Sequence, residues 1–193
     1  MSLAAVALVA TLAVASDASA GVPYTDAPYC SLPATCPNGI VEDFSSYSGF
    51  PISMGNYFVT PKGFVFMGEG LSLYNDSIIG PSLYFECGGG SPFTFQPGVI
   101  KLPVPSAWVT LTFRGMPATI NFIAVNQSGE IIEAVTKTSL GTVEQIKLGP
   151  GDPGSGDSMI EYIFMWHVED GTCSLDCGEP FITNITICDT CGV

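Results

Sequence analysis

The sequence predicts an all-β protein, an antiparallel two-sheet jelly-roll sandwich, and three observations support this fold class. Short apolar stretches recur about every ten residues along most of the chain. Glycine and proline are plentiful, with 22 and 15 residues, whereas charged residues make up only 12% of the chain. No stretch of eleven or more residues has a convincing helical period. Short strands joined by tight turns account for all three observations.

Residues 1–20 are predicted to be a secretory signal peptide. Ser2–Ala15 is almost entirely Ala, Val and Leu, and Ala18-Ser19-Ala20 has the small-x-small pattern of a cleavage site. Asp17 interrupts the apolar run too early for a transmembrane span, which needs about 17 to 25 residues. We therefore expect a secreted protein, extracellular or at the cell surface, with no membrane span after signal removal.

The remaining 173 of the 193 residues suit one domain. We expect residues 21–39 to be an extended, cysteine-bearing lead-in and residues 40–193 to be a single β-sandwich. The net charge of −13, against only five Lys and Arg, makes nucleic acid and anionic membranes poor partners.

In the first half of the chain, short apolar runs separated by turn residues predict the strands. Turns are expected at Pro61-Lys62-Gly63, at Gly68–Gly70 and at Gly80-Pro81. Pro103-Val104-Pro105 indicates a sheet edge or crossover, because proline lacks a backbone donor. The predicted strands are Ile40–Phe44, Phe58–Val59, Phe64–Met67, Leu71–Tyr74, Leu83–Glu86, Phe93–Phe95 and Val99–Leu102.

In the second half the strand pattern is clearer. Trp108–Phe113 alternates a polar face with the apolar face of Val109, Leu111 and Phe113, which is typical of a half-buried strand. A hairpin is expected at Asn126–Gly129, where glycine permits a positive φ. The other predicted strands are Thr119–Val125, Ile131–Thr136, Val143–Leu148, Ile160–Val168 and Phe181–Cys188.

Seven cysteines follow the signal segment, and an oxidising compartment would pair most of them. One must be left over, and sequence alone leaves 105 connectivities open. Proximity favours Cys30 with Cys36 and Cys173 with Cys177, leaving the other three to compete for a third bridge. The spacing of the last four also resembles a zinc site, but oxidation competes for the thiolates that zinc needs. The seven are Cys30, Cys36, Cys87, Cys173, Cys177, Cys188 and Cys191.

Three Asn-x-Ser/Thr sequons begin at Asn75, Asn126 and Asn184. In a eukaryotic host, Asn75 and Asn126 would be the favoured glycan acceptors because both fall in predicted turns. Unmodified turn and strand asparagines explain the three sites equally well while the host is unknown.

Catalysis finds little support in the sequence. His167 is the only histidine and lies inside an aromatic strand, with no serine signature beside it. A glycosidase needs two carboxylates flanking a cleft, and no pair stands out. Glu161, beside Trp166, is the strongest candidate acid. We therefore expect a protein that is not an enzyme.

Calcium is the ion that the sequence favours, and no other cofactor is predicted. Asp152 and Asp157 lie five residues apart in a glycine-bearing loop, and Glu42-Asp43 could form a second site with backbone carbonyls. Ordinary acidic turns explain the same residues.

Exposed aromatic side chains would offer a platform for sugars, whose C–H faces stack on Trp and Tyr while their hydroxyls bond to polar groups. Core packing accounts for most aromatic residues of the chain. Trp108 and Tyr57 lead the candidates for exposure because they adjoin polar or turn residues. Trp166 and Glu161 complete the predicted binding residues.

Several segments resemble the jelly-roll modules of exported PEP-CTERM-type and galactose-binding-like proteins. They are Ile40–Phe44, Gly63–Phe66, Val109–Phe113, the turn at Gly129 and the terminal Phe181–Ile187. The resemblance implies a sandwich that binds carbohydrate or calcium, or a structural or adhesive unit. Thr183 stands where those modules commonly have an Asp, and Ile187–Val193 shows no sorting tail.

The sequence therefore predicts a secreted, disulfide-bonded, non-catalytic sandwich that binds an extracellular glycan or protein partner. The alternative is a structural subunit of a filament, surface layer or virus-like shell, which would be a homo-oligomer or polymer.

Overall fold

The structure is a computed structural model, and it describes residues 36, 38–85, 98–114, 118–139, 141–151, 159–168 and 181–189. Within these ranges every regular element is a strand and none is a helix, so the all-β prediction is confirmed. The strands are β1 (Ile40–Glu42), β2 (Ile52–Val59), β3 (Val65–Asp76), β4 (Gly80–Tyr84), β5 (Gly98–Ser106), β6 (Trp108–Arg114), β7 (Ala118–Val125), β8 (Ile131–Ser139), β9 (Val143–Leu148), β10 (Ile160–Val168) and β11 (Phe181–Cys188).

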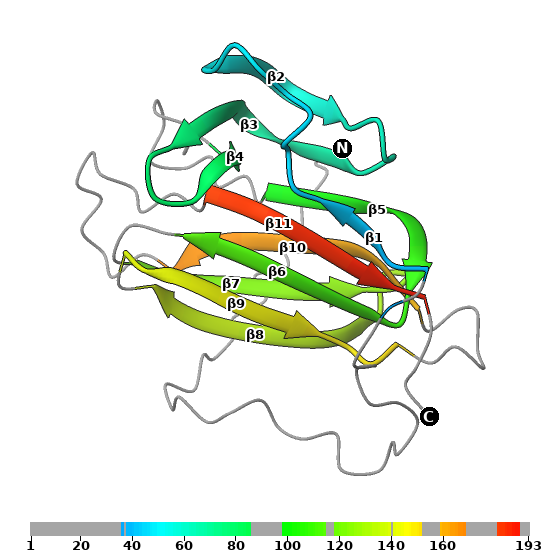
Figure 1. The fold of residues 1–193 in the computed structure, drawn as a ribbon. Helices are drawn as coiled ribbons and strands as arrows, with labels where there is room; N and C mark the ends of the chain where they lie inside the picture. The colour runs from blue at the N-terminus through cyan, green and yellow to red at the C-terminus, as the bar shows by residue number, and fades with distance from the viewer. Residues whose placement is uncertain are drawn as a thin grey trace, which may run out of the picture.

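The strands stack as two antiparallel layers, as the sandwich prediction requires (Figure 1). The front layer runs β9-β6-β11, and both β4 and β1 pair with the other edge of β11. The back layer runs β8-β7-β10-β5-β3, with β2 outside β3. The first half of β3 pairs with β5 and its second half pairs with β4, so β3 joins the two layers.

The hydrophobic core lies between the layers. Phe113 of β6 and Phe122 of β7 meet across it with ring centroids 5.1 Å apart. Val109, Leu111 and Phe113 are completely buried while the residues between them are half-buried, as the alternation in the sequence predicts. The position of Phe113 and Phe122 confirms that the apolar faces of β6 and β7 face each other.

The turn predicted at Gly68–Gly70 is wrong, because β3 runs through it without a break. Strand β3 bends there instead, and Gly70 has a φ of +56°. A side chain at Gly68 would approach the Phe85 ring to within 3.0 Å. These glycines therefore permit a bend and close packing within one strand, and they do not end it.

The first-half strands also differ in length from the prediction. Strand β2 begins at Ile52, six residues before the predicted Phe58, because Ser53, Gly55 and Asn56 interrupt the apolar pattern of its first half. Pro103-Val104-Pro105 lies inside β5, at the stretch where pairing with β10 shifts register between Ile160 and Tyr162. The segment Phe93–Phe95 lies outside the described residues.

The predicted hairpin at Asn126–Gly129 is confirmed. Gly129 has a φ of +84°, and its backbone N–H donates to the Asn126 carbonyl at 3.1 Å. The Asn126 side chain accepts from the Glu130 N–H at 2.8 Å and donates to the Glu130 carboxylate at 2.8 Å. Asn126 is therefore a buried structural residue of this turn.

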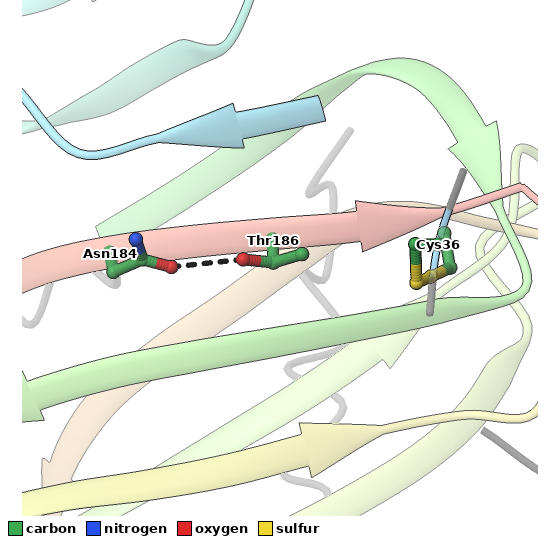
Figure 2. The surroundings of a disulfide bond; sticks show 4 residues. Cys36, Asn184 and Thr186 are labelled. Carbon is green, nitrogen blue, oxygen red and sulfur yellow. Dashed lines mark hydrogen bonds between the residues drawn. A yellow bond between two sulfur atoms is a disulfide. The ribbon is translucent and has the colours of Figure 1, made fainter. Parts of the chain in front are cut away.

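A disulfide joins Cys36 to Cys188, which corrects the expected pairing of Cys36 with Cys30 (Figure 2). The two Cα atoms are 5.6 Å apart although 152 positions separate the residues in sequence. Antiparallel pairing of β1 with β11 brings them together, because Ile40 lies opposite Ile187. The other five cysteines lie outside the described residues.

An ion pair ties the β3–β4 turn to the front layer. Arg114 of β6 donates to the Asp76 carboxylate at 2.9 Å and to the Gly141 carbonyl at 3.0 Å. Asp76 also accepts from the backbone N–H groups of Ile78 and Ile79. Burial raises the pKa of Asp76, but these backbone donors and Arg114 together hold the pKa below its ordinary value.

We expect Asp76→Asn to lower the free energy of unfolding at pH 7 by about 1 to 2 kcal/mol, because the charge pair is lost while the turn can keep its acceptor. A carboxyl with a lowered folded pKa contributes stability above its unfolded pKa and loses it as the pH falls through its folded pKa. The gap between wild type and variant should therefore close between pH 5 and pH 2, as urea denaturation would measure. A gap that persists at pH 2 would contradict this assignment.

Candidate functional site

The outward surface of the back layer gathers aromatic and apolar side chains from five adjacent strands, and we call it the outer back face. Two rows of side chains cross it at right angles to the strands. Cross-strand pairing defines the first row as Tyr57, Met67, Val99, Phe164 and Ile123, and the second as Val59, Val65, Lys101 and Tyr162.

The two-residue period of the strands explains why these side chains share one face. The residues that lie between them in sequence point into the core, and Phe66, Ile100 and Ile163 among them are completely buried. Tyr57 is 60% exposed and Val59 46% exposed at the β2 edge, whereas the residues of the central strands are half-buried. Chain segments far apart in the sequence thus form one continuous surface.

A charged pair lies within the apolar surface. The Lys101 ammonium is 3.6 Å from the Glu161 carboxylate and 5.5 Å from the centroid of the Tyr162 ring. Glu161 lies at the point where the pairing of β10 with β5 shifts register, between Ile160 and Tyr162. Tyr162 first, and Glu161 after it, raise the pKa of Lys101, so both neighbours favour the charged ammonium.

Trp166 adds a third aromatic position on β10, with polar neighbours. It lies opposite Asn121 of β7, which lies opposite Thr136 of β8. The Thr136 hydroxyl donates to the Asn121 amide oxygen at 2.6 Å. Trp166 is half-buried, and the row that it begins continues through Asn121 and Thr136 on the next two strands.

Three of the four predicted binding residues, Tyr57, Trp166 and Glu161, thus lie in the back layer. Trp108 lies in the front layer, where its indole packs against Gly149. A side chain built at Gly149 would come within 2.8 Å of the Trp108 ring. Part of the Trp108 ring is therefore covered by the Gly149 backbone.

Sequence reasoning missed Lys101, Tyr162 and Phe164 as members of the face. The alternation of Tyr162, Phe164 and Trp166 along one strand was an available signal, since side chains two apart share a face. No sequence signal placed Lys101 on this face, because its position there depends on which strand pairs with β10. His167 is the only histidine of the sequence, and its side chain lies outside the described part of the structure.

The carboxylates predicted to bind calcium occupy different environments. Glu42 is 1% exposed, and one of its oxygens accepts from the Phe44 N–H at 3.0 Å. Asp43 is half exposed and accepts from the backbone and hydroxyl of Ser45, which lower its pKa with help from Lys62. In the described part of the chain no three His, Cys, Asp or Glu residues cluster as metal ligands. Asp152 and Asp157 lie outside that part.

The three predicted glycan acceptors differ in their exposure to solvent. Asn75 is exposed on β3, and Asn184 is half-buried on β11, where it accepts from the Thr186 hydroxyl at 3.0 Å (Figure 2). Asn126 is 2% exposed and its amide nitrogen is bonded to Glu130. Its amide nitrogen therefore has little access to solvent.

No protein-family model matches the sequence, and no curated protein matches it either. Among solved structures, a variant of a family 29 carbohydrate binding module aligns with 72% of this chain and 91% of its own, at 12% identity and a TM-score of 0.42. BiXyn10A CBM1 in its apo form aligns with 78% of this chain and 97% of its own, at 11% identity and a TM-score of 0.38.

A family two carbohydrate esterase from Cellvibrio japonicus aligns with 80% of this chain but only 35% of its own, at 11% identity and a TM-score of 0.34. The part of the chain that the structure describes contains no apolar helix of membrane-spanning length.

Proposed function

We propose that the protein binds an extracellular carbohydrate through the outer back face and that it does so without catalysing a reaction. The observation that carries this proposal is the line of Tyr162, Phe164 and Trp166 on β10, with the Lys101–Glu161 pair beside it. Aromatic rings stack on the C–H faces of sugars, and charged or amide groups bond to their hydroxyls.

The dimensions of the face favour an extended glycan over a single sugar. Neighbouring strands lie about 4.8 Å apart, so the first row from Tyr57 to Ile123 spans about 19 Å. Along β10 the aromatic positions repeat about every 7 Å. A ligand that engages Tyr57 and Phe164 together must therefore be several sugar units long.

The charge of the protein favours a neutral glycan. The chain carries a net charge of −13 and only five Lys and Arg residues, of which Lys101 alone lies in the two rows. Polysaccharides rich in sulfate or uronic acid would be repelled by this charge. We therefore infer that the ligand is an uncharged oligo- or polysaccharide.

We expect Tyr57→Ala and Trp166→Ala each to weaken glycan binding about tenfold or more, because each removes a stacking surface from the outer back face. Affinity electrophoresis in gels containing neutral polysaccharides would measure the change. Tyr57 is the sharper test because it is 60% exposed at a sheet edge, where truncation costs little packing.

Tyr74→Ala is the matched control, since Tyr74 is also exposed but packs with Tyr84 and Phe181 outside the outer back face. Glycan affinity should be unchanged in this variant. Equal losses in Tyr57→Ala and Tyr74→Ala, or a wild-type protein that binds no neutral glycan, would overturn the proposal.

A structural subunit is the second candidate function, and the apolar character of the same face favours it. Val59, Val65, Met67 and Val99 lie side by side between the aromatic residues, and apolar surfaces of this extent often mark contacts between proteins. A soluble monomer that binds neutral glycans favours carbohydrate recognition, whereas ordered polymers of the mature chain favour assembly.

Secretion is part of the proposal. The Cys36–Cys188 disulfide supports an oxidising compartment, where such bonds persist. The signal peptide at residues 1–20 and the kinship with exported PEP-CTERM-type and galactose-binding-like modules remain predictions from the sequence. N-terminal sequencing of secreted protein would test the cleavage after Ala20.

A further inference from the structure

A short arm at the beginning of the described chain is held by segments that lie far from it in sequence. The arm consists of Cys36 and residues 38–44, which include β1, and we call it the β1 arm. Its strand pairs with residues 185–187 of β11, and Cys36 forms the disulfide with Cys188. The contacts that attach the arm to the front layer therefore come from the other end of the domain.

Two further contacts hold the β1 arm, and one bond shapes it from within. The Phe44 ring is completely buried, and its centroid lies 5.8 Å from that of the Phe66 ring on β3. Lys62 donates to the Val41 carbonyl at 2.5 Å. Inside the arm, the Phe44 N–H donates to the Glu42 carboxylate at 3.0 Å. The arm thus braces its own backbone, and the groups that bind it lie after β2 in the chain.

Residues 45–51 connect the β1 arm to β2, and we call this segment the hinge. Because β1 pairs with β11 in the front layer and β2 pairs with β3 in the back layer, the hinge crosses between the layers (Figure 1). Ser45, Ser46, Ser48 and Gly49 are exposed. When extended, a hinge of this length reaches about 23 Å, which is enough to lead the arm to a neighbouring molecule.

The turn that leads from β1 back to β2 of the same copy has two unfavourable features. Phe44 has a φ of +55°, a conformation that residues with a side chain rarely adopt. The Tyr47 hydroxyl is buried and has no hydrogen-bond partner among the described residues. An extended hinge would open the turn and return this hydroxyl to water, at the loss of the packing of the Tyr47 ring against Phe58.

We propose that two copies of this chain exchange their β1 arms, so that the arm of each copy pairs with β11 of the other. Each arm then makes with the second copy the contacts that it makes in the monomer, while both hinges open. Exchange of an identical element is a low-cost route to a dimer, and short hinge loops under strain favour it. Association costs freedom of motion, so the share of dimer should rise with protein concentration.

In the exchanged dimer the disulfide joins Cys36 of one copy to Cys188 of the partner subunit. The two thiols give up two hydrogen atoms to a disulfide oxidant such as oxidised glutathione, which is reduced to two thiols. The bond forms during folding and then locks the exchange. Such a dimer carries two outer back faces, which would strengthen binding to a polymeric glycan through avidity. This consequence rests on the proposed function, whereas the exchange itself does not.

The first test uses the wild-type protein. Isotope-labelled and unlabelled protein are mixed in equal amounts, unfolded, reduced and refolded together at high concentration in a glutathione buffer, and the dimer is isolated by size exclusion. Mass spectrometry of unreduced peptides then reads the labels on the peptide that joins Cys36 to Cys188. Exchange predicts that about half of these linked peptides combine a labelled with an unlabelled half. A dimer whose linked peptides are each uniformly labelled, or a wild type that yields only monomer, contradicts the exchange.

Gly49→Ala tests the hinge. Gly49 has a φ of +83° and nothing lies within 4 Å of an added Cβ, so the substitution strains the closed hinge without causing overlap. An extended hinge needs no positive φ, so the ratio of dimer to monomer after refolding should rise at least about fivefold.

Gly129→Ala is the matched control, because Gly129 has a φ of +84° and equally open surroundings but lies in the β7–β8 hairpin. The ratio of dimer to monomer should stay at the wild-type value in this variant. Equal ratios in the two variants would exclude residues 45–51 as the hinge of the exchange. Neither measurement involves a glycan, so failure of the exchange and failure of the proposed function are separate results.

Discussion

Replacing Cys188 by serine should lower the free energy of unfolding by about 4 to 5 kcal/mol. The Cys36–Cys188 bond closes a loop of 152 positions, and the entropy that a crosslink removes from the unfolded chain grows with the logarithm of loop length. A domain of this size has a total stability of about 5 to 15 kcal/mol, so the loss is a large fraction. Urea denaturation of both forms at pH 7 would measure it.

The partner substitution provides the control. Cys36→Ser and the double variant should each lose as much free energy of unfolding as Cys188→Ser. The removal of the same crosslink is the one change that all three variants share. Mass spectrometry of unreduced peptides should find Cys36 joined to Cys188. A peptide that joins Cys36 to Cys30 would show that proximity in sequence, and not the β1–β11 pairing, decides the bond.

Sequence alone predicted the second half of the sandwich well, because those strands alternate cleanly. Strand β6 shows this best, with Val109, Leu111 and Phe113 all buried. Strand β2 is longer than predicted because Ser53, Gly55 and Asn56 interrupt the apolar pattern of its first half. The sequence predicts a turn at Gly68–Gly70 because glycine allows both a turn and a bent strand, and only tertiary packing decides between them.

The binding face could be predicted only in part. Strand β10 supplies Tyr162, Phe164 and Trp166 from a local pattern, and the sequence singled out Trp166 and Glu161. The contribution of Tyr57 depends on the order β2-β3-β5-β10, which brings together residues about one hundred positions apart. The disulfide was unpredictable for the same reason, since its partners meet through a strand pairing between the two ends of the domain.

Gly149 should be the least replaceable glycine of the described chain. Its φ is +137°, a conformation that residues with a side chain rarely adopt. A Cβ atom there would lie 2.5 Å from the Ala107 carbonyl oxygen and 2.8 Å from the Trp108 ring. The same residue donates its N–H to the Glu133 carboxylate, and the Gly151 N–H bonds to the Ala107 carbonyl at 2.8 Å. The Ala107 carbonyl therefore cannot move away without breaking its bond to Gly151.

We expect Gly149→Ala to lower the free energy of unfolding by about 3 kcal/mol or more, through the combined cost of strain and overlap. Gly129→Ala measures the cost of backbone strain without the cost of steric overlap. Gly129 also has a positive φ, of +84°, but nothing lies within 4 Å of its added Cβ, so we expect a loss of only about 1 to 2 kcal/mol. Chemical denaturation of the two variants would compare them directly. Equal losses would mean that the backbone around Ala107 and Trp108 relaxes freely, and that the close approach of this loop to β6 does not hold the front layer in place.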